Sequence, residues 1–472
     1  MKNVKKWAAL FLTAAMLTGC GSAASETVTP NENPVETIAE ADSGTDTGND
    51  AAADATADTG SDASADQAAD ASADAGSDTP ADPAADDSAD APANPNQVDG
   101  CDIPNVLIGG YNGVPDTEPF AFVREMKIIW NLGNTFDAYS DRPLANELDT
   151  ETYWHGIRTT EQTIKNIHAE GFETVRIPVS WHNHFTDDDY TISEEWLARV
   201  QEVVDYAIND GMHVILNIHH DNHEEFGCFY PDSEHLDQSV HYIERIWSQL
   251  SERFADYDEK LIFEGMNEPR LVGHNNEWWI DATSEDCKDA IECINVLNQT
   301  FVDTVRAGGG QNETRYLMCP GYCASLDGVT NGGFRIPEDP KGPEGHIMLE
   351  VHAYTPYAFA LEDNNKGSFD SANSEDVKDI DATMNKLYMS FVSQGVPVVV
   401  DEFGARDKKG NYQDRVDYAT YFIASARARG ITCGWWDNAA LAGSGEIFAI
   451  YDRRQEKVAY PAIIAGLMKY AE

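Results

Sequence analysis

The sequence predicts a (β/α)8 TIM barrel preceded by a disordered acidic linker. Three observations predict the barrel. From about residue 120 onward, apolar strand-like runs alternate with helical periods, as in repeated βα units. Several expected helices end in a glycine directly before the next strand, at positions 171, 211, 395 and 430. Eight such units over about 350 residues fit a barrel with extended loops.

The expected strands are short apolar runs at residues 128–133, 174–180, 213–219, 261–267, 315–321, 347–354, 396–404 and 431–438. The helical stretches between them include 194–209, 240–254, 289–306 and 415–429, with a last helix at 459–471. A doubly wound open sheet is the main alternative. It would more often carry a glycine-rich phosphate loop after the first strand, and this sequence has none there.

Residues 1–21 have the features of a signal segment for export. Lysines at positions 2, 5 and 6 precede an apolar run that is too short to span a bilayer permanently. The segment ends in Leu-Thr-Gly-Cys, which resembles a bacterial lipobox, so Cys20 would carry the lipid. An ordinary signal peptide is the alternative. We expect an extracytoplasmic lipoprotein, anchored at a membrane or cell surface through Cys20.

Residues 22–100 form a low-complexity segment rich in Ala, Asp and Ser. The segment has 19 acidic residues, no Lys or Arg and no aromatic residue. Such a chain cannot bury enough apolar surface to offset its ordering entropy, so we expect a disordered spacer. The third segment, residues 101–472, is then the domain that forms the barrel.

The formal charge of −50 divides unevenly among these segments: +3 on the leader, −19 on the spacer and −34 on residues 101–472. A domain this acidic repels phosphate backbones, so we expect no nucleic-acid partner. The charge does not disfavour a neutral polysaccharide. We expect the domain to be a monomer.

The eight cysteines favour disulfides or buried thiols over a metal site. If Cys20 is lipidated, seven remain, and at least one of them is unpaired within the chain. Cys319 and Cys323 have C-x3-C spacing, but no second pair stands at zinc spacing and no histidine follows closely. We therefore expect no metal and no cofactor.

Reactive groups of such barrels lie at the C-terminal ends of the strands. Polar and aromatic residues lie in the last part of the expected strands or just after them: Asn134, Arg176, His182, His219, His220, Asn267, Glu268, His352, Tyr354, Glu402 and Trp436. A barrel with a purely structural role has no need of this distribution. One alternative is that His219, His220, Asp221 and His223 bind a divalent metal that activates water.

Glu268 and Glu402 can face each other across the barrel mouth. Glycoside hydrolysis requires paired carboxylates: one protonates the leaving oxygen, and the other attacks the anomeric carbon or activates water. We expect the like charges to raise the pKa of one partner and make it an acid at neutral pH. The separation of the two groups would decide between retention and inversion.

Seven segments in barrel order carry a family resemblance: WNLGNTFDA (130–138), GFETVRIPVSWHNHF (171–185), VILNIHHD (214–221), LIFEGMNEPR (261–270), VHAYTPY (351–357), VPVVVDEFGARDK (396–408) and GWWDN (434–438). Together they resemble glycoside hydrolase family five of clan A, most closely its fourth subfamily of endo-β-1,4-glucanases and xyloglucanases. The resemblance spans about residues 120–472.

The resemblance implies a retaining enzyme in which Glu268 is the acid/base and Glu402 the nucleophile. Asn267 would bind the sugar 2-hydroxyl, and Trp436 would be the sugar platform. The resemblance further implies that Arg176 and Tyr354 hold the nucleophile and that His219 and His352 line the rim; His220, Asn134 and His182 are further candidates for sugar contacts. Arg176 can also neutralise Glu264 inside the barrel, because strand alternation can point both inward.

The leading hypothesis is therefore an endo-acting hydrolase of β-1,4-glucans such as cellulose, β-glucan or xyloglucan. Two alternatives remain. The first is a mannan- or xylan-directed enzyme of the same family. The second is a surface lipoprotein that binds polysaccharide without cleaving it. Asn267, Glu268 and Glu402 argue against the second, because a binding protein needs no acid paired with a nucleophile.

Overall fold

The computed structural model describes residues 97–98, 101–102, 111–363, 367–443 and 445–472. The predicted signal segment 1–21, its Cys20 and almost all of the predicted linker 22–100 lie outside these residues. A short ladder crosses the boundary predicted at residue 100, because β1 (Gln97–Val98) pairs antiparallel with β2 (Cys101–Asp102).

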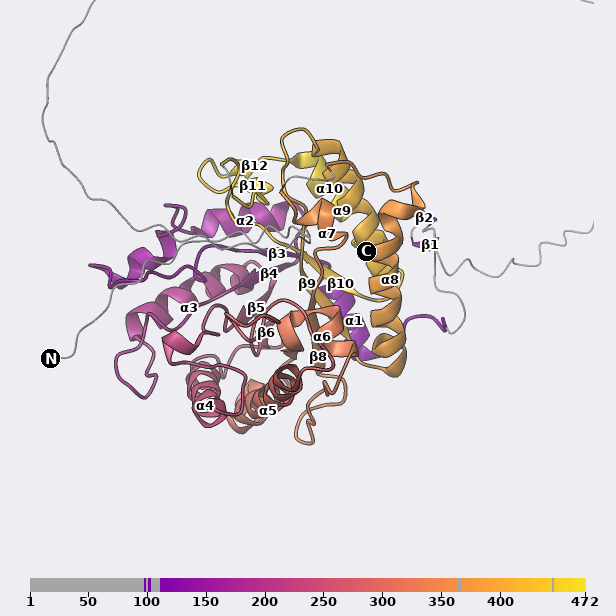
Figure 1. Ribbon diagram of the computed structural model, residues 1–472. Coiled ribbons are helices and arrows are strands. Elements are labelled where there is room, and N and C mark those ends of the chain that lie inside the picture. The colour runs from indigo at the N-terminus through magenta and orange to yellow at the C-terminus, as the bar shows by residue number, and fades with distance from the viewer. Residues whose placement is uncertain (1–96, 99–100, 103–110, 364–366, 444) are drawn as a thin grey trace, which may run out of the picture. The chain divides into compact units, whose positions relative to one another are not determined.

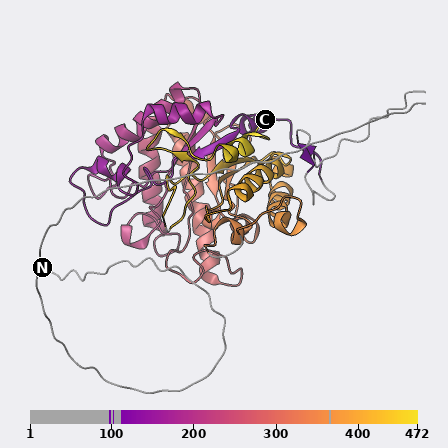
Figure 2. The same cartoon turned by 90° about the horizontal axis from the view of Figure 1, so that it is seen from above.

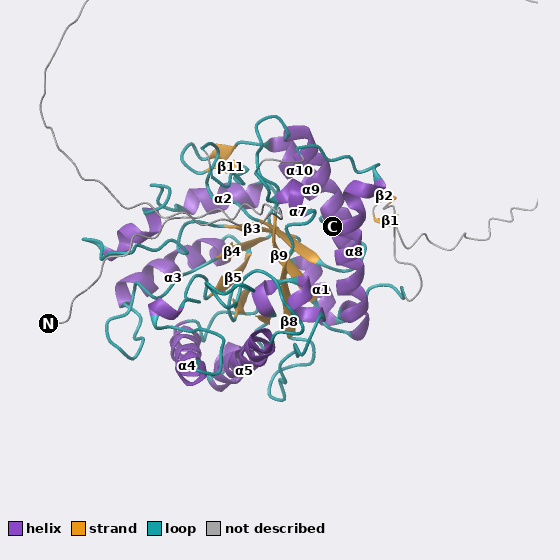
Figure 3. Cartoon of the chain, viewed as in Figure 1, coloured by secondary structure: helices purple, strands orange, loops and turns teal. Residues whose placement is uncertain are grey.

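Eight parallel strands form a closed barrel, which confirms the predicted fold. They are β3 (Ile128–Asn131), β4 (Thr174–Ile177), β5 (His213–Asn217), β6 (Leu261–Glu264), β7 (Leu317–Pro320), β8 (Ile347–His352), β9 (Val398–Phe403) and β10 (Thr432–Trp435). Each strand pairs with its neighbour in the chain, and β10 closes the barrel by pairing with β3. The strands lie at the centre with helices around them (Figure 3).

The helices are α1 (Glu118–Glu125), α2 (Glu161–Ala169), α3 (Glu194–Asn209), α4 (Leu236–Arg253), α5 (Glu285–Ala307), α6 (Leu326–Thr330), α7 (Tyr357–Ala360), α8 (Ser374–Ser390), α9 (Tyr412–Arg427) and α10 (Pro461–Met468). Closure brings the first and last parts of the barrel together, so indigo and yellow segments adjoin (Figures 1 and 2). Side-chain caps begin several helices; for example, the Thr160 and Ser284 side chains accept from backbone N–H groups of α2 and α5.

Short elements occupy the loops. The 3₁₀ turns are η1 (Glu147–Thr152), η2 (Glu224–Phe226), η3 (Gly310–Glu313), η4 (Tyr322–Ala324) and η5 (Val392–Gln394), and a hairpin joins β11 (Tyr451–Asp452) to β12 (Lys457–Val458).

The strands are shorter than predicted at their C-terminal ends. The expected strand 261–267, for example, leaves the ladder after Glu264. The residues after Glu264 still form isolated backbone hydrogen bonds to the neighbouring segment: Asn267 N donates to Ile218 O at 2.9 Å. The apolar pattern continues past the ladder because the first rim residues are also buried. The candidate site residues therefore lie either in the last part of a strand, as Glu402 does in β9, or in the loop that follows, as Glu268 does after β6.

Strand alternation builds the barrel interior in layers. Ile262, Met348 and Val399 belong to one buried apolar cluster, which α1 joins through Phe122, Val123 and Met126. Two residues further along the same strands stand Glu264, Glu350 and Asp401, all fully buried. Because side chains repeat on one face every second residue, these carboxylates form the next layer toward the mouth.

The cysteines of the barrel are buried thiols. Cys228, Cys287, Cys293, Cys319, Cys323 and Cys433 are all free and buried, so among the described side chains the expectation of buried thiols is confirmed and that of disulfides is not. No helix in the described part of the chain is both long and apolar enough to cross a membrane.

Candidate active site

Arg176 is the centre of the polar layer and is fully buried. Its guanidinium donates to both oxygens of Glu264 at 2.6 Å, a bidentate pair inside the barrel. Nη1 also donates to Glu402 at 2.5 Å, and Nη2 donates to Asn267 Oδ1 at 2.8 Å. Both predicted contacts of Arg176 are therefore present: it neutralises Glu264 and it holds Glu402.

Glu402 is the last residue but one of β9, and each of its carboxylate oxygens accepts a hydrogen bond. Oε1 accepts from Arg176, and Oε2 accepts from the Tyr354 hydroxyl at 3.0 Å. Tyr354 lies just beyond β8, the strand that pairs with β9. The neighbouring strands β8 and β9 thus bring the Tyr354 hydroxyl next to the Glu402 carboxylate. The donors Tyr354 and Arg176 both stabilise negative charge on this carboxylate.

Glu268 lies in the loop after β6 and faces the same point. His352 Nδ1 lies 2.8 Å from Glu268 Oε1 and 3.6 Å from Glu402 Oε2. One oxygen of each glutamate and one nitrogen of His352 lie within 4.8 Å of one another. Pro269 follows Glu268 and disfavours helix there, so the chain turns at the position of this carboxylate.

The pKa expected for Glu268 is wrong in direction. Burial raises the pKa of Glu268, but the hydrogen bond and charge of His352 outweigh it and lower that pKa to about 2. Burial likewise lowers the pKa of His352, but the charge of Glu402 and the bond to Glu268 raise it to about 9. The prediction considered only the two like charges. The His352 imidazole lies beside both carboxylates, and its hydrogen bond and charge favour the ionised form of Glu268.

Trp436 forms the aromatic wall of the mouth. Its ring lies parallel to His219, with the ring centroids 5.9 Å apart. A Cβ at Gly133 would lie 2.8 Å from the Trp436 ring, so only glycine lets the indole lie there. His219 is held in turn by Asn217, whose Nδ2 lies 3.1 Å from His219 Nδ1. Burial lowers the pKa of His219 well below its usual value, so this ring is neutral.

The remaining candidates for sugar contacts, His220, Asn134 and His182, differ in the solvent exposure of their side chains. The side chain of His220 is 33% exposed and faces the rim. Asn134 is half-buried at a positive φ of 60°, where its backbone N–H donates to Asp137. His182 is turned away: its Nδ1 lies 2.7 Å from Asp221, its ring stacks on Phe226, and its side chain is 5% exposed. This geometry suits a support of the rim.

The four residues considered as an alternative metal site, His219, His220, Asp221 and His223, do not form one cluster. Asp221 accepts from the Trp181 and His182 backbones, and His223 Nδ1 accepts from Glu225 N at the start of η2. A different carboxylate, Asp137, lies near His219 and His220. Its oxygens already accept from the backbone N–H groups of Asn134 and Thr135.

Two further side chains close to the site were not among the predicted site residues. Arg270 Nη1 donates to the Glu268 carbonyl at 2.9 Å, and its guanidinium lies 4.1 Å from the ring of Trp278, which is 50% exposed. Glu350 lies below His352 in the barrel. A sequence signal existed for Glu350: it is a charged residue in an apolar strand, two positions before His352, and therefore on the same face.

Comparison with known proteins agrees with this geometry. Residues 137–441 match the family described as Cellulase (glycosyl hydrolase family 5). Endoglucanase A of Ruminococcus albus is 39% identical over 342 residues, which are 72% of this chain and 89% of that protein.

Solved structures give the same result. A family 5 lichenase from Caldicellulosiruptor sp. F32 is 50% identical with a TM-score of 0.75, covering 78% of this chain and 99% of its own. A broad-specificity endoglucanase from Ruminococcus champanellensis with bound cellotriose is 39% identical with a TM-score of 0.68, covering 75% and 99%. The chain belongs to the cellulase family, glycosyl hydrolase family 5.

Proposed function

We propose that this protein is an endo-acting glycoside hydrolase that cleaves β-1,4-glucan backbones with retention of anomeric configuration. In this proposal Glu402 attacks the anomeric carbon while Glu268 protonates the departing glycosidic oxygen. A covalent glycosyl-enzyme forms, and water then releases the sugar with Glu268 acting as base.

The observation that carries the proposal is the closeness of the two carboxylates. Oxygens of Glu268 and Glu402 lie within 4.8 Å of each other. Retaining enzymes place their carboxyl groups about 5–5.5 Å apart, whereas inverting enzymes need roughly 6.5–9.5 Å to admit a water molecule. The short separation therefore supports a double displacement.

The neighbouring side chains support the same chemistry. Arg176 positions Asn267, whose amide suits the sugar 2-hydroxyl at the reacting ring. The Trp436 indole offers a rigid apolar face, which suits the C–H face of a pyranose. His219, His220 and Asn134 complete the proposed sugar-binding surface.

The backbone preference is proposed from the relatives, which include a lichenase and a broad-specificity endoglucanase. A mannan- or xylan-directed enzyme of the same family is the second candidate.

One experiment tests mechanism and substrate together. The protein is incubated with β-glucan, xyloglucan, mannan and xylan, and early products are followed by proton NMR. We expect oligosaccharides from the glucans, with the β-anomer appearing first and mutarotation later. If the α-anomer came first, the double displacement would be wrong. Oligosaccharides released from mannan or xylan alone would overturn the glucan assignment.

We also propose that a lipid on Cys20 anchors the protein at the cell surface, with residues 22–100 as spacer. The Cys20→Ser variant is expected to move from the membrane fraction to the soluble fraction of the producing cell. Cys101→Ser is the matched control and is expected to stay in the membrane fraction. Membrane association unchanged by Cys20→Ser would reject the anchor, and loss in both variants would point to a cause other than lipidation.

A further inference from the structure

Two buried carboxylates lie directly beneath His352 and have no role in the scheme above. Glu350 on β8 and Asp401 on β9 are both fully buried. Within the described residues, neither Glu350 oxygen and neither Asp401 oxygen has a hydrogen-bond partner. One oxygen of each lies close to His352 Nε2, at 3.6 Å for Glu350 and 3.7 Å for Asp401. The Nε2 atom itself also has no hydrogen-bond partner.

The surroundings cannot neutralise both carboxylates. Apart from His352, which already bonds to Glu268, the nearest cation is Arg176, which already bonds to Glu264 and Glu402. Its Nε lies 3.0 Å from Asp401 Oδ2, so Asp401 receives part of that charge. Facing groups on the neighbouring strands add no positive charge: Glu264 belongs to β6, and the Cys319 thiol to β7. Two bare carboxylates in this position would be strongly destabilising.

Electrostatics agree that a proton is held here. Burial raises the pKa of Glu350 well above its usual value, and the charges of Glu264 and Asp401 raise it further. Burial also raises the pKa of Asp401, although Arg176 opposes that shift. Two carboxylates that both lie within 4 Å of the same imidazole nitrogen titrate as one unit. The contact with Arg176 favours the charge on Asp401 and the proton on Glu350.

We propose that Glu350 and Asp401 hold one proton between them, and that the single negative charge left on this pair keeps the His352 imidazole protonated beside Glu268. Glu350 and Asp401 are then positioning residues, which act on the reaction only through His352. Other charged or titratable groups face His352 as well: Glu268 hydrogen-bonds to Nδ1, Glu402 Oε2 lies 3.6 Å from the same nitrogen, and the neutral His219 lies nearby.

The consequence for hydrolysis rests on the proposed function. Glu268 can protonate a leaving group only while the His352–Glu268 pair holds its proton. That proton is lost as the pH rises through the pKa of His352, about 9. The charge on Glu350 and Asp401 adds to the effects of Glu402 and Glu268 on His352 and so moves the alkaline limit of activity upward, whereas the acidic limit belongs to the carboxylates at the mouth.

Isosteric amides separate this proposal from its alternatives. Glu350→Gln removes one carboxyl group and the shared proton, so the remaining Asp401 keeps the charge of −1. Asp401→Asn leaves the same charge on Glu350. Only the double variant, Glu350→Gln with Asp401→Asn, removes the charge. Because it lies within 4 Å of the imidazole, its loss should lower the His352 pKa by at least about one unit.

The test is an NMR titration of the full chain with ¹³C-labelled histidine, with the His352 signal assigned from its absence in His352→Gln. We expect the wild type and both single variants to titrate alike, and the double variant at lower pH. A downward shift in each single variant would mean that both carboxylates are ionised. No shift in the double variant would mean that neither carries charge. Either result overturns the proposal.

Two further measurements keep the result interpretable. Asp381→Asn is a matched control, since Asp381 is a buried carboxylate between α8 and α9 that bonds to Tyr421 and Ser425. It should leave the His352 titration unchanged, and thermal unfolding of each variant checks its folding. The alkaline limit of glucan hydrolysis should shift together with the NMR titration in the double variant. If the protein cleaves no glucan, the proposed function is wrong, but the NMR titration still tests the proposed charge on Glu350 and Asp401 independently.

Discussion

Glu402→Gln is expected to lower kcat on β-glucan by about 10⁴-fold or more, on the scale of other enzymes that lose a nucleophile. The amide cannot form the glycosyl-enzyme, but its oxygen can still accept from Arg176, which donates to Glu402 at 2.5 Å in the native protein. Binding of a cello-oligosaccharide should therefore remain. Steady-state rates and calorimetric binding measure the two quantities separately.

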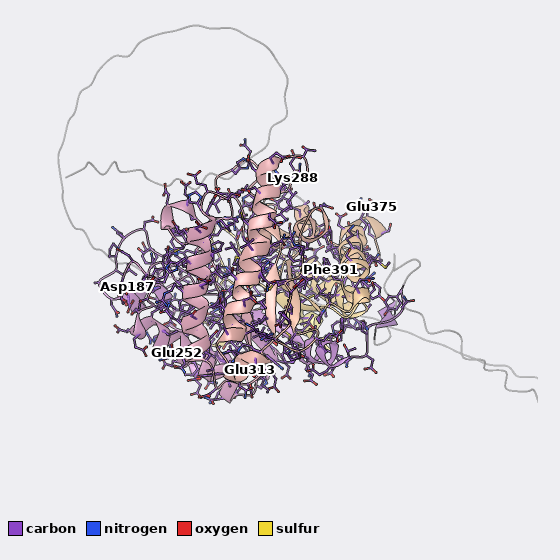
Figure 4. The ribbon with its side chains drawn as sticks, turned by 90° about the horizontal axis from the view of Figure 1, so that it is seen from below. Asp187, Glu252, Lys288, Glu313, Glu375 and Phe391 are labelled. Carbon is purple, nitrogen blue, oxygen red and sulfur yellow. The ribbon has the colours of Figure 1, made fainter. Side chains whose placement is uncertain are left out.

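Glu252→Gln is the matched control for this variant. Glu252 is exposed on α4, and Figure 4 shows it with Glu313 at the end of the domain opposite Lys288 and Glu375. Because Glu252 is near the C-terminal end of α4, it lies where the strands begin, away from the proposed site. Its substitution should leave kcat unchanged. Substantial β-glucan turnover by Glu402→Gln would remove Glu402 from the role of nucleophile.

Glu268→Ala is expected to lower kcat/KM on β-glucan by about 10²–10⁴-fold, the usual contribution of a general acid. With aryl glycosides whose leaving group needs no proton, the variant should keep much of the rate of the first step, formation of the glycosyl-enzyme, because Glu402 is intact. A burst of released phenol followed by slow turnover would show that the second step, which needs a base, has become limiting.

The contrast between the two variants is the decisive comparison. On activated aryl glycosides, Glu268→Ala should show a burst and Glu402→Gln should show none. Equal behaviour of both variants on these substrates would reject the assignment of acid and nucleophile. Glu268→Ala also removes the partner of His352 Nδ1, so the His352 pKa should fall toward its usual value, which the same NMR titration can detect.

The order of the strands and most rim residues could be predicted because each is indicated by a pattern of residues within one short segment of the sequence. Strand 261–264 is a run of Leu, Ile and Phe before Glu264, and the helix at 194–209 has the predicted bounds. The rim could be predicted for a topological reason: in a closed parallel barrel all strands point the same way, so every residue that follows a strand reaches one mouth.

Three features could not be read from sequence because they depend on long-range proximity. The residue at which a strand stops pairing depends on the neighbouring strand, as where β6 ends at Glu264. His182 turns to Asp221, a contact across 39 positions that no local pattern specifies. The sign of the Glu268 pKa shift depends on His352, which is 84 positions away in the chain.

The amino-acid sequence was enough to predict the barrel, the positions of Glu268 and Glu402 near the C-terminal ends of their strands, and the family resemblance. These follow from side-chain periodicity and from motifs that lie within single segments. The separation of Glu268 and Glu402, the contact of His352 with both of them and the buried pair of Glu350 and Asp401 came only from the three-dimensional structure. Those properties depend on distance and burial, since the interaction of charges changes with every ångström and with the loss of water around them.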